Sequence, residues 1–176
     1  MQKLIRKQKI IIFDGVDRCG KTEIALALSN ELRIPYFKNH LEKKYWDSTN
    51  GFANALKYDQ PYFLQFLEQT GYSVIIDRSY PSEYVYSQIY NRQTDFSLIT
   101  EIDRRFAKLD TFIVVPYRDD YSNVRKTDEL ISEDKFDLIH EKYKEFCQFT
   151  RCKTLRLNVD DEDLKRELKM IREFMS

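Results

Sequence analysis

The chain has 176 residues, of which 42% are apolar and 33% are charged, a composition typical of a single globular domain over residues 1–176. Its basic and acidic residues number 29 each, which excludes a strong overall field for nucleic acid or an anionic membrane. No apolar run approaches the roughly 18 residues of a membrane span, and three cysteines without metal-ligand spacing are typical of a reducing compartment. We therefore expect a cytoplasmic protein that binds neither membranes nor, stably, nucleic acid.

The first predicted element is a buried strand, Lys9–Phe13, which leads into the spacing G-x-x-x-x-G-K-[ST]. Glycines let such a loop turn its backbone N–H groups toward an anion, and a predicted helix from Lys21 to Leu32 adds its positive N-terminal end. The lysine of this motif reaches the outer phosphates of a nucleotide, and the hydroxyl of Thr22 is a ligand for magnesium. We expect a nucleoside polyphosphate here, bound by Gly15, Val16, Asp17, Arg18, Cys19, Gly20, Lys21, Thr22 and Glu23.

Strands and helices alternate along the rest of the chain, which predicts an α/β fold: a five-stranded parallel sheet with helices on both faces. We expect Pro61 to kink or split the helix that contains it and Pro116 to stop the strand before it. Asp160 and Asp161 are expected to cap the last helix. The further predicted strands lie at 33–38, 73–77, 111–115 and 154–159, and the further helices at 52–69, 82–90, 97–108, 133–149 and after 161.

A charged segment at 117–132 has few apolar residues and no clear periodicity. We interpret it as a mobile lid that closes over bound phosphates and excludes water. Arg118, directly after the third buried strand, and Arg125 are the expected phosphate contacts of this lid. The alternative is an ordinary solvated face, which is what most charged segments are.

The pair Asp77-Arg78 stands at the end of a second fully apolar strand. Ligands of parallel sheets bind at the carboxyl ends of the strands, so this pair is expected to lie beside the phosphate-binding loop. A carboxylate there holds magnesium or its water shell, and an arginine grips a phosphate with two hydrogen bonds. The alternative interpretation is a structural ion pair at a strand end.

The phosphate loop and the Asp77-Arg78 motif resemble those of the thymidylate kinases. This family belongs to the deoxynucleoside monophosphate kinases and has the P-loop kinase fold. The loop between Phe13 and Thr22 is similar to the phosphate loop of members that carry an arginine inside it, here Arg18. The family also has an Asp-Arg motif with a serine five residues and an aromatic nine residues after the aspartate, and Ser82 and Tyr86 stand at those spacings. Compact nucleotide kinases of this kind suit bacteriophages, which would place the chain in a host cytoplasm.

The resemblance implies a role for each matching residue. Lys21 and Arg18 would stabilise the transferred γ-phosphoryl group of ATP, and Asp77 and Arg78 would complete the catalytic set. Thr22 and Asp77 would hold Mg²⁺, the latter through its water shell. The implied substrate-binding residues are Asp17 at the sugar 3′-hydroxyl, Arg78 at the acceptor phosphate, Ser82, and Tyr86 against the sugar edge, where it disfavours a ribose 2′-hydroxyl.

The sequence also departs from the family. Ser79 replaces the tyrosine or phenylalanine that follows Asp-Arg, as in deoxynucleoside kinases. At the position where the family has the arginine that recognises thymine, this sequence has Lys57. The position of the aromatic residue that stacks on the base is next to Phe52. The family resemblance implies a homodimer through helices beside the sheet, whereas the short segment between Asn39 and Gly71 removes part of that interface.

Three functions remain open on this basis. The first is transfer of the γ-phosphoryl group of ATP to a deoxynucleoside monophosphate, with dTMP the foremost substrate, and Arg18 favours it. The second is phosphorylation of a nucleoside 5′-hydroxyl with Asp77 as the base, which Ser79 favours. A related variant acts on a modified base within DNA, but the neutral net charge is unfavourable for gripping a duplex. The third function, from another class, is a nucleotide-binding regulator without metabolic turnover.

Overall fold

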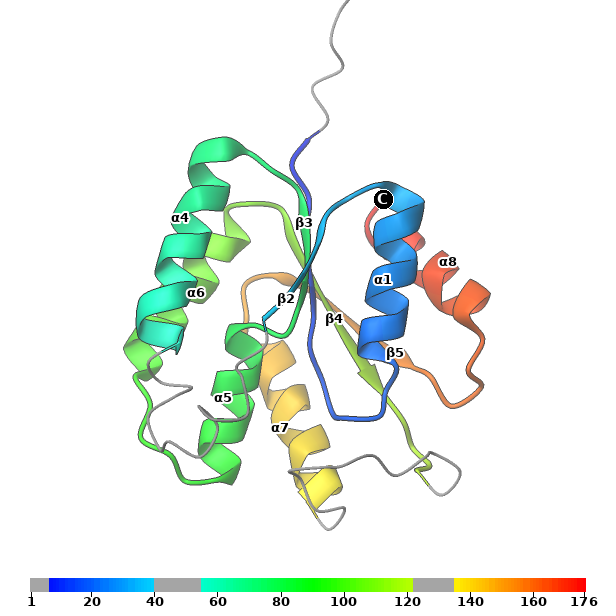
Figure 1. Ribbon diagram of the computed structural model, residues 1–176. Helices are drawn as coiled ribbons and strands as arrows, with labels where there is room; N and C mark the ends of the chain where they lie inside the picture. The colour runs from blue at the N-terminus through cyan, green and yellow to red at the C-terminus, as the bar shows by residue number, and fades with distance from the viewer. Residues whose placement is uncertain (1–6, 40–54, 122–134) are drawn as a thin grey trace, which may run out of the picture.

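The computed structural model describes residues 7–39, 55–121 and 135–176. The described part contains one sheet with the strand order β2-β3-β1-β4-β5, in which every neighbouring pair is parallel (Figure 1). The predicted five-stranded parallel sheet is therefore confirmed. The strands are β1 (Ile10–Phe13), β2 (Tyr36–Lys38), β3 (Val74–Asp77), β4 (Thr111–Tyr117) and β5 (Lys153–Asn158).

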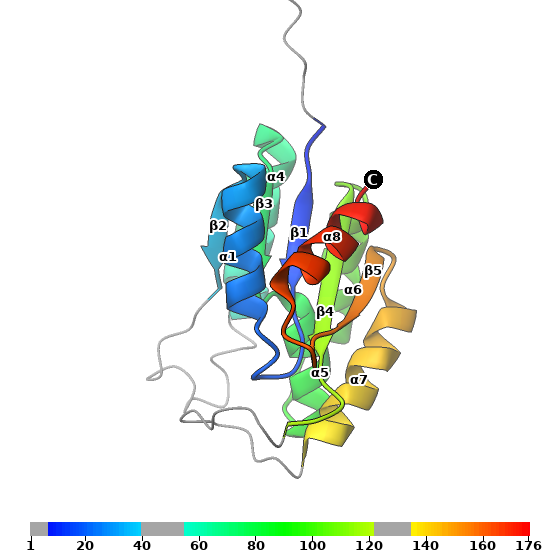
Figure 2. The ribbon, with the colours of Figure 1, turned by 90° about the vertical axis from the view of Figure 1, so that its right-hand side faces the viewer.

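Helices cover both faces of the sheet, as the fully apolar central strands require. Figures 1 and 2 show α1 and α8 on one face and α4, α5, α6 and α7 on the other. All four residues of β1 have zero exposure, so the sheet's centre is also the centre of the hydrophobic core. The helical elements are α1 (Lys21–Leu32), η1 (Ala55–Asp59), α4 (Gln60–Thr70), α5 (Tyr80–Ile89), α6 (Phe96–Ala107), α7 (Phe136–Phe149) and α8 (Leu164–Phe174).

Pro61 divides its helix as predicted, into the π-helical turn η1 and the α-helix α4. The proline lies in the first turn of α4, where a backbone N–H would lack an intrahelical partner in any case. The start of α5 differs from the prediction, because this helix begins at Tyr80 rather than at Ser82. Its first turn is held by a distant carboxylate, Asp14, which accepts hydrogen bonds from the N–H groups of Ser79 and Ser82.

The expectation that Pro116 stops its strand was wrong, since β4 continues to Tyr117. Pairing with β1 ends at Phe13 and Val114, so the missing N–H of Pro116 costs no hydrogen bond on that side. On the other side, Pro116 stays in register with Leu157 of β5. The lid proposed at 117–132 therefore overlaps β4 at Tyr117, and its residues 122–132 lie outside the described part.

The expected cap of the last helix was also wrong. Asp163, rather than Asp160 or Asp161, accepts hydrogen bonds from the backbone N–H groups at the start of α8. Asp160 instead accepts the N–H of Asp119, while Asp161 forms an ion pair with Arg166. Among the described helices, none is long and apolar enough to cross a membrane.

Candidate active site

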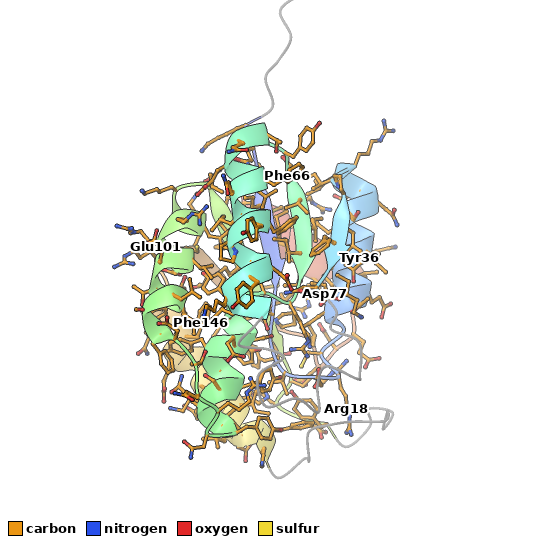
Figure 3. All side chains as sticks on the ribbon, turned by 60° about the vertical axis from the view of Figure 1, so that its left-hand side comes forward. Arg18, Tyr36, Phe66, Asp77, Glu101 and Phe146 are labelled. Atoms are coloured by element: carbon orange, nitrogen blue, oxygen red, sulfur yellow. The ribbon has the colours of Figure 1, made fainter. Side chains whose placement is uncertain are left out.

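The sheet brings the two predicted motifs together at the carboxyl ends of its strands. Phe13, which precedes the phosphate loop, is in register with Asp77 on the neighbouring strand β3. In Figure 3, Asp77 lies close to Tyr36 of β2, and Arg18 of the phosphate loop lies farther toward the same end of the molecule. The predicted proximity of Asp77 to the phosphate loop is thus present in the structure.

The shape of the phosphate loop depends on two glycines. Gly15 has φ = +148°, and a Cβ atom there would lie 2.7 Å from the carbonyl oxygen of Pro116. Gly20 adopts a left-handed conformation as the residue before α1. Arg18 also has a left-handed φ of 65°, a strained conformation for a non-glycine residue that is typical of functional loops. These conformations turn the chain around the N-terminus of α1, where an anion is stabilised.

Lys21 is buried in the first turn of α1, and its ammonium donates a hydrogen bond to the carbonyl of Val16. It also lies 3.7 Å from the carboxylate of Asp17. Burial, reinforced by the nearby positive charge of Arg78, lowers the pKa of Lys21. An anion in the loop would offset both effects, so the geometry fits a site for phosphate groups.

Thr22 and Asp77, the predicted magnesium ligands, are in contact. The Thr22 hydroxyl donates a hydrogen bond of 2.6 Å to Oδ2 of Asp77, and the Tyr36 hydroxyl donates one of 2.8 Å to the same oxygen. Among the described residues, no group of three or more His, Cys, Asp or Glu side chains forms a metal cluster. Mg²⁺ in nucleotide sites takes most of its ligands from phosphates and water and only one or two from protein, so these hard oxygens fit Mg²⁺.

Arg78 is held from three sides, with φ in the left-handed region at 67°. Its guanidinium forms a hydrogen-bonded ion pair with Asp17, donates a hydrogen bond of 3.2 Å to the Ser82 hydroxyl, and lies 5.7 Å from the centre of the Tyr86 ring. Burial by itself raises the pKa of Asp17, but Arg78 and Lys21 together bring it below the usual 3.8. Four residues with predicted acceptor roles therefore form one cluster: Asp17, Arg78, Ser82 and Tyr86.

Tyr86 is 9% exposed, and burial raises the pKa of its hydroxyl. Within the described residues this hydroxyl is buried without a hydrogen-bond partner, although the Arg78 guanidinium lies over its ring. A buried unpaired hydroxyl costs free energy, which a polar ligand group recovers. The predicted contact with a sugar stays a prediction, and this geometry is compatible with it.

Asp14, between Phe13 and Gly15, is a residue to which the sequence analysis gave no role. It is fully buried, and its carboxylate accepts hydrogen bonds from the N–H of Gly15 and from the hydroxyls of Ser82 and Tyr143, in addition to the N–H groups at the start of α5. One side chain thereby fixes the phosphate loop, α5 and α7 relative to one another. The sequence offered one indication that Asp14 belongs to the site, namely its position directly before Gly15 at the end of a buried strand.

Ser79, the departure from the thymidylate kinase pattern, has a structural use. Its hydroxyl donates a hydrogen bond of 3.0 Å to the side-chain oxygen of Gln60, a buried residue at the start of α4. Lys57, expected at the base, is exposed, and its ammonium lies 5.4 Å from the centre of the Tyr58 ring. In this helical segment, Gln60 rather than Lys57 contacts the Asp77-Arg78-Ser79 motif. The sequence analysis did not identify Gln60.

The remaining predicted residues lie at the edges of the site. Arg118 is buried and donates hydrogen bonds to the carbonyl of Arg18 and to Glu162, so it braces the phosphate loop. Glu23 is exposed in the first turn of α1. Phe52 and Arg125 lie outside the described residues. The nucleotide contacts expected of Glu23, Arg118 and Arg125 remain predictions.

The segment that leads into the proposed lid is also joined to the phosphate loop. The Tyr121 hydroxyl lies 3.2 Å from the sulfur of Cys19 and 2.9 Å from Nε2 of His140 in α7. Burial raises the pKa of the Cys19 thiol, so this cysteine is a packing residue in its protonated form. The same contacts connect the phosphate loop to α7, the helix that follows the proposed lid.

A hollow of about 950 Å³ lies at the opposite end of the sheet, where the strands begin. It is lined mainly by apolar and aromatic side chains, among them Tyr36, Phe37, Phe63, Phe66 and Tyr72. Neither the phosphate loop nor Arg78 reaches it. Because ligands of parallel sheets bind at the carboxyl ends of the strands, we assign the candidate site to that end despite the size of this hollow.

No protein-family model and no curated protein matches the chain in sequence. Solved structures do match it. A YorR protein from Bacillus subtilis, in complex with phosphorylated GDP, aligns with a TM-score of 0.67 and 20% identity over 93% of both chains. A deoxyadenosine kinase from M. mycoides, with the products dCMP and dCDP bound, aligns with a TM-score of 0.56 and 19% identity over 93% of this chain and 97% of that one. The thymidylate kinase from Ehrlichia chaffeensis gives a TM-score of 0.56 and 15% identity over 94% and 97%.

This chain has the P-loop nucleotide kinase fold. Each match covers more than nine tenths of this chain and of the compared chain, so the likeness extends well beyond the phosphate loop. At these identities the likeness establishes architecture alone. What this chain binds and which reaction it serves have to be argued from the site itself.

Proposed function

We propose that the protein transfers the γ-phosphoryl group of ATP to a deoxynucleoside monophosphate, with dTMP the foremost substrate. The observation that supports this most is the cluster of Lys21, Thr22, Asp77, Arg78 and Asp17 at one edge of the sheet. It combines groups suited to a nucleoside triphosphate with a second cationic group suited to an acceptor phosphate. The neighbouring structures include a kinase of a nucleoside and a kinase of a nucleotide, so the fold alone does not separate the two.

The donor side of the site consists of the phosphate loop, Lys21 and Thr22. The backbone N–H groups and the N-terminus of α1 would hold the phosphates, while Lys21 would exchange its contact with the Val16 carbonyl for a phosphate oxygen. Thr22 and Asp77 would hold Mg²⁺, which when bound neutralises charge on the phosphates. Catalysis in such a site is mostly positioning and charge stabilisation.

The acceptor side consists of Arg78, Asp17 and Tyr86. Arg78 would grip the acceptor phosphate, and Asp17, already paired with Arg78, would accept a hydrogen bond from the sugar 3′-hydroxyl. The guanidinium of Arg78 lies over the ring of the buried Tyr86, and this ring would disfavour a ribose 2′-hydroxyl. Arg18, in its left-handed conformation inside the phosphate loop, would add positive charge at the transferred group.

The second candidate is a deoxynucleoside kinase, and Ser79 is the observation that favours it. In this structure the Ser79 hydroxyl is occupied by Gln60, so its presence is explained by the packing of α4 against α5. Asp77, the base that a nucleoside kinase would need, accepts hydrogen bonds from Thr22 and Tyr36 at one oxygen. We therefore rank the monophosphate first.

One experiment decides between the candidates. The protein is incubated with ATP, Mg²⁺ and each deoxynucleoside or its monophosphate, and ADP and product are measured by chromatography. Monophosphates are expected to be used at least about 30-fold more efficiently than nucleosides, because charge-assisted hydrogen bonds from Arg78 to the acceptor phosphate would contribute about 2 kcal/mol or more in a closed site. Equal use of thymidine and dTMP would favour the nucleoside kinase, and ADP formation without any phosphorylated acceptor would favour a regulator.

Deoxy substrates are expected to be preferred over ribo substrates because of Tyr86. Tyr86→Ala should narrow that preference, and Tyr62→Ala, which changes an exposed tyrosine on α4, is the control. If the preference is unchanged in Tyr86→Ala, the selection against a 2′-hydroxyl lies elsewhere.

A further inference from the structure

Lys38 is a charged residue at the site to which neither the sequence motifs nor the proposed function gives a role. It is the last residue of β2 and stands in register with Asp77 on the neighbouring strand β3. Its ammonium lies 3.4 Å from the hydroxyl oxygen of Thr22 and 3.9 Å from Oδ2 of Asp77. Lys38 therefore contacts both side chains that are suited to Mg²⁺.

The hydrogen-bond directions explain why a cation is attracted to this position. Thr22 donates its proton to Asp77, so the lone pairs of its oxygen are left to face Lys38. Oδ2 of Asp77 also accepts the Tyr36 hydroxyl, which holds the carboxylate in place. The three residues form a rigid oxygen site, and an ammonium occupies its open side.

Lys38 and a bound metal ion would compete for the same two side chains, because both would draw on the Thr22 hydroxyl and, for the metal ion through its water shell, on the Asp77 carboxylate. Two cations drawn to Thr22 and Asp77 would repel each other, which disfavours simultaneous binding. The Lys38 side chain is 47% exposed, which leaves its four-carbon stem room to swing. A displaced ammonium would still be tethered to the edge of the sheet where the phosphates are expected.

We propose that Lys38 and Mg²⁺ exchange at Thr22 and Asp77 during each reaction cycle. Before the metal binds, Lys38 neutralises Asp77. After the metal binds, the displaced ammonium contacts the phosphate groups in transfer. The contact between the displaced ammonium and the phosphates rests on the proposed function. The exchange itself requires only that a nucleotide binds together with Mg²⁺. Lys38 thus sets how much Mg²⁺ the site needs and adds a further positive charge to the reaction.

The test uses Lys38→Met, which keeps the length of the side chain and removes its charge. Binding of ADP is measured by calorimetry over a range of Mg²⁺ concentrations, and the concentration of half-maximal binding is compared with wild type. Removing the competing cation should lower this concentration at least about 3-fold. Lys38→Arg should leave it near the wild-type value. Lys169→Met, at an exposed lysine on α8, makes the same change of net charge away from the site and should have no effect.

Turnover with saturating substrates and Mg²⁺ is the second measurement, and it should fall at least about 10-fold in Lys38→Met. An unchanged Mg²⁺ requirement, equal to that of Lys169→Met, would overturn the exchange. A lowered requirement with full turnover would overturn the phosphate contact. If wild-type protein binds ADP with Mg²⁺ but phosphorylates no nucleotide or nucleoside, the proposed function fails, and the calorimetric comparison still decides the exchange.

Discussion

The hydrogen bond between Tyr143 and Asp14 should be the most informative single contact of the site's framework. The Tyr143 hydroxyl donates a hydrogen bond of 2.6 Å to Oδ1 of Asp14, and the two residues are 1% and 0% exposed. Burial raises the pKa of Tyr143, so its hydroxyl keeps its proton over the whole pH range of an assay. Tyr143→Phe removes this donor and leaves the ring, so the change tests the hydrogen bond rather than the packing.

The expected cost follows from the partners that remain. A hydrogen bond to a charged group contributes about 1.5–3 kcal/mol, and the Asp14 carboxylate keeps its backbone donors and the Ser82 hydroxyl. We therefore expect Tyr143→Phe to lower the free energy of unfolding by about 2 kcal/mol. For a chain of this length that corresponds to a fall in Tm of roughly 4–8 °C.

Urea unfolding followed by circular dichroism measures this change. Tyr62→Phe is the matched control, because Tyr62 is 73% exposed and should lose less than about 0.5 kcal/mol. Ser82 donates to the same oxygen of Asp14, so Ser82→Ala combined with Tyr143→Phe should cost about 0.5–1 kcal/mol more than the sum of the single changes. A loss below about 0.5 kcal/mol in Tyr143→Phe would refute the view that Asp14 holds α7 against the phosphate loop.

The remaining predictions concern the phosphate loop and the acceptor side. Lys21→Ala should lower phosphoryl transfer at least about 100-fold with little change in the circular dichroism spectrum, because its charge acts mainly in the transition state; near-normal turnover would contradict the donor site. Arg78→Ala should remove most of the preference for monophosphates over nucleosides in competition assays, and a preserved preference would assign the acceptor phosphate to another residue. The pKa of Asp17 in the folded protein is below 3.8, so its carboxylate stabilises the fold above that value and this contribution is lost as the pH falls through the folded pKa. The stability difference between wild type and Asp17→Asn should accordingly be largest near pH 7 and shrink in acid. A difference that grows in acid would mean that folding raises the pKa of Asp17 instead of lowering it. Gly15→Ala should destabilise the protein and weaken ATP binding in calorimetry, because its Cβ would lie 2.7 Å from the carbonyl oxygen of Pro116, and normal binding would contradict this close approach of the phosphate loop to β4.

The sequence was sufficient for the architecture because the relevant signals are local. A β-branched strand, a glycine-rich loop and an amphipathic helix follow one another from Lys9 to Leu32, and each is determined by neighbouring residues. The rule that parallel strands present their carboxyl ends at one edge then correctly placed Asp77 beside Thr22. The same rule applied to β2 would have drawn attention to Lys38.

Element boundaries were less accurate where the deciding partner is distant. The start of α5 depends on the carboxylate of Asp14, which is 65 residues away from Ser79 in the chain. The passage of β4 through Pro116 depends on where β1 stops pairing. Propensity describes what a residue does to its neighbours along the chain, so it carries no information about such contacts.

Residue types and their spacing along the chain were enough to predict which chemistry is available: a loop for phosphates, a hydroxyl and a carboxylate for magnesium, and an arginine for a second anion. How these groups are held and shared follows from the folded arrangement alone. Asp14 serves three elements at once, Ser79 is occupied by Gln60, and Lys38 stands where a metal ion would bind. Motif spacing fixes residue types along one segment, whereas hydrogen bonds between segments depend on distances that exist only after the sheet has formed.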